Sequence, residues 1–155
     1  MIIKNFIKAA RLRTLPLSIS GIILGGFLAM SDGLFNGVIF SLALITTIGF
    51  QVISNFANDY GDAIHGADSQ DREGPKRAVQ SGQISPQAMR LALVIFSILA
   101  FGSGLLLLWV ALDDFGKVFW VFLGLGLAAI AAAITYTAGW RPYGYAGLGD
   151  LSVLI

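Results

Sequence analysis

The segment from Asn55 to Asp62 carries the side chains whose types and spacing suit chemistry. It follows a long apolar stretch and reads Asn-Phe-Ala-Asn-Asp-Tyr-Gly-Asp. On a helix, Asn55, Asp59 and Asp62 recur at i, i+4 and i+7, and Asn58 lies one turn before Asp62, so their oxygens are expected to share a face. Carboxylates at this spacing repel each other unless a cation lies between them. Mg²⁺ prefers one or two carboxylates with phosphate oxygens, which predicts a metal site with these four residues and Asp68 as ligands.

A cluster of cations follows the acids. Arg72, Lys76 and Arg77 fall within a short stretch that also contains Gly74-Pro75 and Ser81-Gly82. Guanidinium and ammonium groups are suited to phosphate oxygens, so acids for a metal followed by cations predict a diphosphate site. The alternative is a solvated loop whose acids and bases neutralise one another. Ionisable groups at the end of an apolar helix favour the functional interpretation.

The composition places this chemistry in a membrane. Of 155 residues, 56% are hydrophobic and 12% charged, and the mean hydropathy is +0.78, whereas soluble domains have about 25% charged residues. The net charge of +1 gives no basic field for nucleic acid. The lack of cysteine excludes disulfides and thiolate chemistry, and a single histidine argues against a zinc site. Any metal is therefore expected to be a hard cation bound by oxygen.

Four apolar stretches predict an all-α, polytopic transmembrane bundle in one membrane domain, 1–155. The predicted spans are 15–30, 35–56, 88–112 and 118–136, each close to the roughly 20 residues that cross a bilayer, with an acidic and basic loop at 57–87. Pro16 and the pair Ser85-Pro86 are typical of helix starts. Residues 2–10 fit either an amphipathic helix at the interface or a basic tail.

Charge asymmetry predicts the orientation. With a cytoplasmic N-terminus, every Lys and Arg except Lys117 lies inside, which satisfies the positive-inside rule. We therefore expect the N-terminus and the acidic segment on the cytoplasmic side of the inner (plasma) membrane, with Tyr143 and Tyr145 as interfacial anchors. Small residues recur four apart at Gly21 and Gly25, and at Gly124, Ala128 and Ala132, which predicts close helix contacts.

The last residues, Leu151 to Ile155, begin a new apolar run. A single helical turn cannot span a bilayer. We therefore expect the chain to be the N-terminal part of a longer protein.

At these residues the sequence resembles the UbiA-type intramembrane prenyltransferases, and among them those that act on 1,4-dihydroxy-2-naphthoate. The resemblance covers essentially the whole chain and rests on four stretches: Ala-Arg-Leu-Arg-Thr-Leu-Pro at 10–16, Asn-Asp-Tyr-Gly-Asp at 58–62 and on to Asp68, Gly74-Pro75 with Ser81-Gly82, and Tyr-Thr-Ala-Gly-Trp-Arg-Pro at 136–142 running on to Gly-Leu-Gly-Asp at 147–150.

The resemblance implies the N-terminal half of a roughly nine-helix bundle, with a lipid-facing tunnel for the prenyl chain. Asn58, Asp59 and Asp62 would form the first Asp-rich motif and act on the diphosphate through Mg²⁺. The superfamily often has a third acid four residues later, where this chain has Gly66 and then Asp68.

The resemblance also implies roles for other residues. Arg72, Lys76 and Arg77 would contact the diphosphate. A ring face of Tyr136 or Tyr60 would stabilise an allylic cation, although packing is the alternative for each. Arg141 would pair with the acceptor's carboxylate, or else serve only as a positive-inside residue.

The implied function is Mg²⁺-dependent transfer of a polyprenyl group from polyprenyl diphosphate to 1,4-dihydroxy-2-naphthoate, giving demethylmenaquinone. Alternative acceptors are 4-hydroxybenzoate, homogentisate, tetrapyrroles and glycerophosphate lipids. A cation transporter and a non-enzymatic membrane protein are the alternatives from other classes. The family needs a second Asp-rich motif on a later helix, so the 155-residue chain alone is expected to be inactive.

Overall fold

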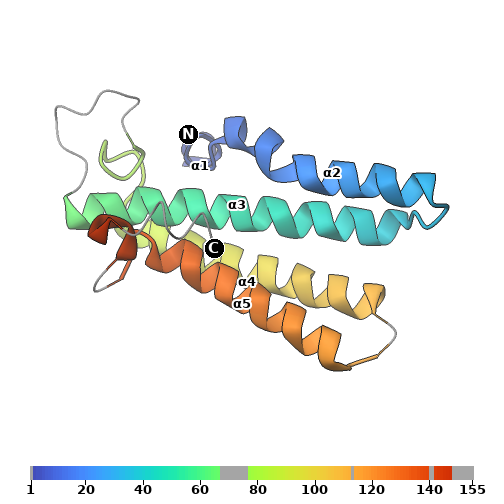
Figure 1. Ribbon diagram of the computed structural model, residues 1–155. Helices are drawn as coiled ribbons and strands as arrows, with labels where there is room; N and C mark the ends of the chain where they lie inside the picture. Colours follow the sequence, from blue (N-terminus) through green and yellow to red (C-terminus); the bar gives the residue numbers. More distant parts are fainter. Residues whose placement is uncertain (1, 67–76, 113, 140–141, 148–155) are drawn as a thin grey trace.

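Four long helices lie side by side and form most of the molecule (Figure 1). The computed structural model describes residues 2–66, 77–112, 114–139 and 142–147. The long helices are α2 (Leu15–Ser31), α3 (Gly37–His65), α4 (Pro86–Ala111) and α5 (Lys117–Thr135). The shorter elements are α1 (Ile2–Ala9) and the 3-10 helices η1 (Leu12–Thr14) and η2 (Tyr143–Ala146). These ranges contain no strand, and the predicted all-α class is confirmed.

Four helical stretches are long and apolar enough to cross a membrane. They are Ile2–Ser31, Gly37–His65, Pro86–Ala111 and Lys117–Thr135, as expected for a multi-pass membrane protein. One predicted boundary is wrong, because residues 57–65 continue helix α3 instead of opening the loop predicted at 57–87. The helix ends at Gly66, whose φ of 66° is left-handed and suits glycine. Asn58, Asp59 and Asp62 therefore belong to a rigid element.

The helix starts follow the signals in the sequence. The Ser85 hydroxyl accepts a hydrogen bond from the Ala88 amide at 3.2 Å, and Pro86 occupies the first turn of α4. Pro16 has the equivalent place in α2. The helical alternative for residues 2–10 is also confirmed, because α1 covers most of that stretch before the chain turns at Arg11 with a φ of 49°.

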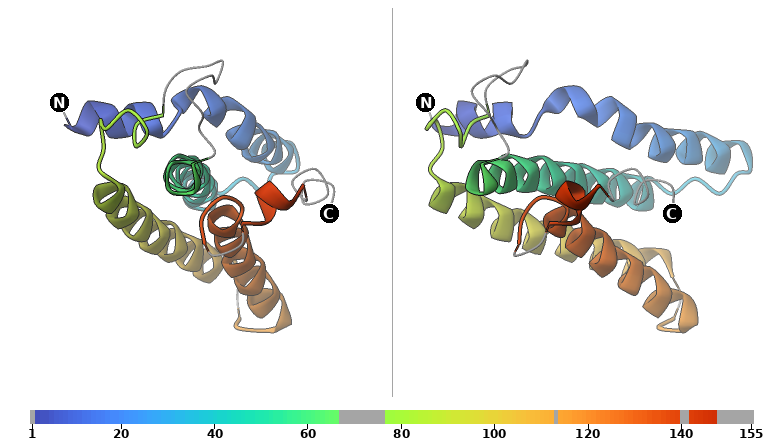
Figure 2. Two further views of the ribbon diagram at one scale, coloured as in Figure 1. Left: turned by 90° about the vertical axis from the view of Figure 1, so that its left-hand side faces the viewer. Right: turned by 60° about the vertical axis from the view of Figure 1, so that its left-hand side comes forward.

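Helix α3 lies at the centre of the bundle (Figure 2). It packs against α2, α4 and α5, and most extensively against α4. A Cβ atom on Gly49 would lie 2.8 Å from the Ala100 Cβ atom, so the two helices approach closely there. Thr46 and Ser103 also share a hydrogen bond of 3.0 Å between α3 and α4.

The described residues make no close helix contact at three other glycines where one is predicted. Among these residues, an added Cβ atom at Gly21, Gly25 or Gly124 would meet no atom within 4 Å outside its own stretch of helix. Small residues permit close packing but do not specify it. A close contact also needs a second helix packed against the small residue, as α4 is packed against Gly49 of α3.

The buried core lies at the end of the bundle that carries the acidic segment. Phe56 is 1% exposed, and its ring makes edge contacts with Phe6 of α1 and Phe96 of α4, with centroid distances of 5.9 and 5.4 Å. Elsewhere large apolar side chains such as Leu17 and Leu99 face outward. Lipid can cover such surfaces, so tight packing is concentrated where polar groups must be held in place.

Phe56→Ala is expected to destabilise the bundle strongly. A buried phenylalanine replaced by alanine typically loses about 3–5 kcal/mol, and here contacts to two other helices disappear. Thermal melting of the purified protein in detergent measures the effect. The matched control is Phe27→Ala on α2, whose side chain is exposed. Equal melting temperatures for the two variants would contradict a core centred on Phe56.

Candidate functional site

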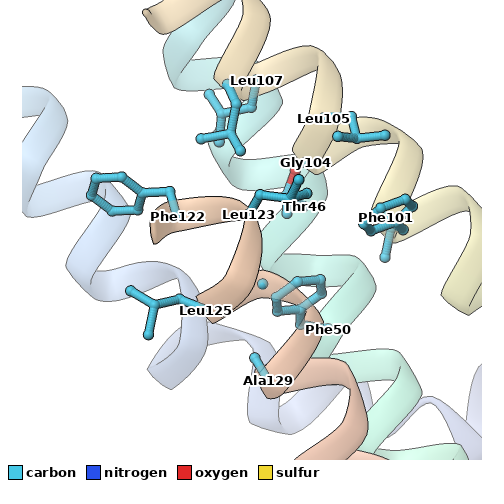
Figure 3. Close-up of a pocket in the computed structure, with 13 residues that line it drawn as sticks. Thr46, Phe50, Phe101, Gly104, Leu105, Leu107, Phe122, Leu123, Leu125 and Ala129 are labelled. Carbon is cyan, nitrogen blue, oxygen red and sulfur yellow. The ribbon is translucent and has the colours of Figure 1, made fainter. Parts of the chain in front are cut away.

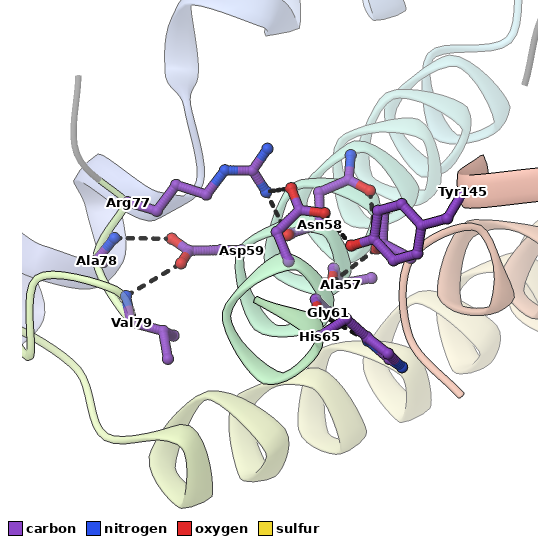
Figure 4. Close-up of polar contacts among 11 residues, drawn as sticks. Ala57, Asn58, Asp59, Gly61, His65, Arg77, Ala78, Val79 and Tyr145 are labelled. Atoms are coloured by element: carbon purple, nitrogen blue, oxygen red, sulfur yellow. Dashed lines mark hydrogen bonds and ion pairs between the residues drawn. The ribbon is translucent and has the colours of Figure 1, made fainter. Parts of the chain in front are cut away.

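The Asp59 side chain of helix α3 binds the backbone of the turn that begins at Arg77. Its carboxylate is 2% exposed and accepts hydrogen bonds from the backbone amides of Ala78 at 3.1 Å and Val79 at 3.0 Å (Figure 4). Both oxygens therefore have a backbone partner. The bonds fix the position of Arg77, which immediately precedes these two amides.

Asp62 is held from two sides by residues distant in the sequence. One oxygen, Oδ2, forms an ion pair with Arg77, and the other, Oδ1, accepts a hydrogen bond from the Tyr145 hydroxyl. Arg77 also donates to the backbone carbonyl oxygen of Asn58. Both members of the ion pair are largely buried, and a buried charge without a partner is costly. The turn and α3 are thus coupled through one guanidinium group.

The segment after α5 crosses α3 at Gly61. A Cβ atom at this glycine would lie 2.2 Å from the Thr137 carbonyl oxygen, so only glycine allows the backbones to come this close. The Thr137 hydroxyl lies 2.9 Å from the carbonyl oxygen of Ala57 and 3.0 Å from the side-chain oxygen of Asn58, and its one proton can be donated to either acceptor. One turn later, the ring nitrogens of His65 lie 2.9 Å from the Gly61 carbonyl oxygen and 3.0 Å from that of Gly139.

Asn55 contacts the N-terminal bend. Its side-chain nitrogen donates to the Ala10 carbonyl oxygen at 2.9 Å and to the Thr14 hydroxyl at 3.2 Å. The residue is 4% exposed, and both of its amide hydrogens are used. Asn55 therefore fixes the junction between α1 and α2 on helix α3.

The four side chains predicted to share one face of α3 therefore contact three different parts of the molecule. Asn58 and Asp62 lie together with Arg77, whereas Asp59 turns toward the 77–79 backbone and Asn55 toward the N-terminal bend. Consecutive residues on a helix point about 100° apart, which separates Asn58 from Asp59.

Tyr136, another predicted site residue, packs edge-on against Tyr143, with ring centroids 5.2 Å apart. The predicted site residues Asp68, Arg72, Lys76 and Arg141 lie outside the described residues.

Two residues of the site were missed in the sequence, namely Thr137 and Tyr145. The sequence predicts only an interfacial anchor at Tyr145, and the available signal for Thr137 is a polar residue directly after an apolar span. Neither residue type marks a binding site on its own. Their partners on α3 become visible only when the segment after α5 is placed beside it.

Asn58 and Asp62 carry oxygen atoms of the kind that could hold a divalent metal. Within the described ranges, no three residues among His, Cys, Asp and Glu converge. The face formed by Asn58 and Asp62 offers one carboxylate and one amide oxygen. Mg²⁺ is commonly bound through one or two carboxylates, with substrate phosphates and water completing its shell. Arg77, beside these oxygens, is suited to a phosphate group.

An apolar pocket lies farther along the bundle, between α3, α4 and α5 (Figure 3). Its volume is about 370 Å³. Phe50 of α3 lies 12 residues before Asp62, about 18 Å along the helix axis. The lining consists almost entirely of apolar side chains, from Thr46, Phe50, Ala100, Phe101, Gly104, Leu105, Leu107, Leu108, Phe122, Leu123, Leu125, Gly126 and Ala129.

Comparison with known proteins identifies the family of this bundle. Residues 19–155 match the model of the UbiA prenyltransferase family. The chain belongs to this family. Its members are prenyltransferases, and UbiA prenyltransferases generally use a divalent metal.

Curated UbiA relatives cover nearly the whole chain. It is 46% identical over 156 residues to 1,4-dihydroxy-2-naphthoate octaprenyltransferase of Haemophilus influenzae, covering 99% of this chain and 50% of the relative. The proteins of the same name in Escherichia coli and Mycobacterium tuberculosis are 49% and 35% identical, each over 97% of this chain and 48% and 49% of their own length. The chain thus spans about half the length of these relatives. No solved structure gives a significant match.

Gly61→Ala is expected to disrupt the contact between α3 and the segment after α5. The added methyl group would overlap the Thr137 backbone, so the segment must move away and the Thr137 bonds to Ala57 and Asn58 are lost. Thermal melting should show a clear loss of stability. Gly102→Ala is the control, because its Cβ atom would meet open space. If both variants melt like the unchanged protein, α3 and this segment are not in close contact.

Proposed function

We propose that the full-length protein transfers a polyprenyl group from polyprenyl diphosphate to 1,4-dihydroxy-2-naphthoate with the help of Mg²⁺. The observation that carries the proposal is the pairing of Asp62 and Arg77 beside Asn58 at one end of a membrane-spanning helix in a chain of the UbiA family. The names of the relatives support the choice of acceptor.

Asn58, Asp62 and Arg77 have complementary tasks in this proposal. Asp62 and the amide oxygen of Asn58 would hold the cation that accompanies the diphosphate, and Arg77 would exchange part of its contact with Asp62 for a phosphate oxygen. Asp59 keeps Arg77 in reach through its bonds to Ala78 and Val79. Mg²⁺ held there would supply positive charge to the leaving diphosphate.

The reaction proposed at this site is an electrophilic substitution. The bond between the allylic carbon and the diphosphate oxygen breaks, and its electron pair leaves with the diphosphate. A ring carbon of the naphthoate forms the new bond, and the carboxylate on that carbon departs as carbon dioxide. Arg77 stabilises the developing negative charge on the diphosphate from its fixed position on the turn. Asp68, Arg72, Lys76, Tyr136 and Arg141 remain proposed participants.

The apolar pocket between α3, α4 and α5 is proposed to take part of the prenyl chain. It is lined by residues such as Phe50, Phe101 and Phe122 and lies deeper in the bundle than the charged groups. A substrate with a charged head and a long apolar tail requires this separation of polar and apolar surfaces.

We further propose that the protein lies in the inner membrane, with the charged end of the bundle and the N-terminus on the cytoplasmic side.

Asp62→Asn is expected to reduce prenyl transfer by at least 100-fold, because a charged ligand and the partner of Arg77 are lost together. The assay measures transfer of a labelled prenyl group in membranes containing the full-length protein, with and without Mg²⁺. It compares 1,4-dihydroxy-2-naphthoate with 4-hydroxybenzoate as acceptors. Asp32→Asn, an exposed carboxylate at the opposite end of α2, is the matched control.

The outcomes of this assay test the choice of acceptor and the role of Asp62 separately. Mg²⁺-dependent product from the naphthoate alone, lost in Asp62→Asn and kept in Asp32→Asn, supports the proposal in full. Product from 4-hydroxybenzoate alone overturns the choice of acceptor. Unchanged transfer by Asp62→Asn overturns the role of this carboxylate.

Filling the apolar pocket is expected to affect long donors more than short ones. Gly126 lines the pocket, and a side chain there would enter open space. Gly126→Leu should raise the KM for an octaprenyl donor several-fold and leave that for a geranyl donor unchanged. Gly124→Leu, on the same helix but outside the pocket lining, is the control. Equal effects on both donors would show that the prenyl chain does not occupy this pocket.

A further inference from the structure

Tyr145 contacts the acidic site from a segment that the site's motif does not include. Its hydroxyl donates to Oδ1 of Asp62, whereas Arg77 is paired with Oδ2. Two donors on the two oxygens fix both the position and the plane of a carboxylate. Each oxygen keeps a second lone pair, so a cation can still bind Asp62 while Tyr145 remains in place.

The position of Tyr145 is built into the surrounding backbone. The Gly144 amide donates to the Tyr136 carbonyl oxygen at 2.9 Å, and the Tyr143 hydroxyl donates to the Ala132 carbonyl oxygen at 3.0 Å. These bonds hold η2 against the end of α5. The Tyr145 ring also contacts the His65 ring, with centroids 5.7 Å apart (Figure 4). The bonds that hold η2 and the contact with the His65 ring together direct the hydroxyl at Asp62.

We propose that Tyr145 is a positioning residue for the metal-binding carboxylate of Asp62. The inference rests on the proposed function, in which Asp62 binds the cation that accompanies the diphosphate. Carboxylate ligands are commonly oriented by hydrogen bonds from neighbouring groups, and loss of such a partner typically weakens metal binding by about 10- to 100-fold. In this proposal Tyr145 acts through its hydrogen bond to Asp62.

The test measures Mn²⁺ binding to the full-length protein in detergent, in the presence of inorganic diphosphate, by electron paramagnetic resonance. Tyr145→Phe removes the hydroxyl and keeps the ring, and it should weaken Mn²⁺ binding by about tenfold or more. Thr135→Val is the matched control, because it removes a nearby hydroxyl that donates to the Ala131 carbonyl oxygen within α5 and takes no part in holding η2. That variant should bind Mn²⁺ as the unchanged protein does.

Each outcome decides a different point. Equal Mn²⁺ affinities for the two variants overturn the role of Tyr145 and leave the proposed function intact. Failure of the unchanged protein to bind Mn²⁺ with diphosphate overturns the proposed metal site, and the inference with it. Thermal melting checks folding. If Tyr145→Phe does not melt cooperatively, Tyr145→His, which keeps a ring and an N–H donor, is measured instead. Its Mn²⁺ affinity must then exceed that of Asp62→Asn, and an equal affinity overturns the role of Tyr145.

Discussion

The ion pair between Asp62 and Arg77 is the interaction on which the rest of the site depends. Both side chains are largely buried at the end of an apolar bundle, where an unpaired charge would be costly. The pair forces the turn at 77–82 against α3, and Asp59 secures the same turn through two backbone amides. A strong electrostatic constraint at one end therefore organises helices that otherwise pack through small and apolar side chains.

The bundle separates tight packing from lipid-covered surface. Around Phe56, side chains from α1, α3 and α4 exclude solvent and hold the polar residues of α3 in fixed positions. Toward the other end, apolar residues face outward and a pocket opens between α3, α4 and α5. The arrangement suits a UbiA-family protein whose proposed substrate has a charged head and an apolar tail, because each part meets a matching surface on the same central helix.

The sequence predicted the four spans well because hydropathy reports directly on what a bilayer requires. It placed Asn58, Asp59 and Asp62 on one helix correctly, since helical spacing is local information. It could not predict that Asp59 and Asn55 turn to backbone partners, because those partners at Ala78 and Ala10 are brought in by tertiary packing. Tyr145 was missed for the same reason, since 83 residues separate it from Asp62.

The most direct test of this account is a structure of the full-length protein with Mn²⁺ and a non-hydrolysable prenyl diphosphate, in which anomalous scattering locates the metal. The account predicts a metal bound to the carboxylate of Asp62 beside Asn58, with Arg77 on the diphosphate and Asp59 still bonded to the amides of Ala78 and Val79. A metal bound to Asp59 with Asp62 uninvolved, or no metal at this end of α3, would contradict it.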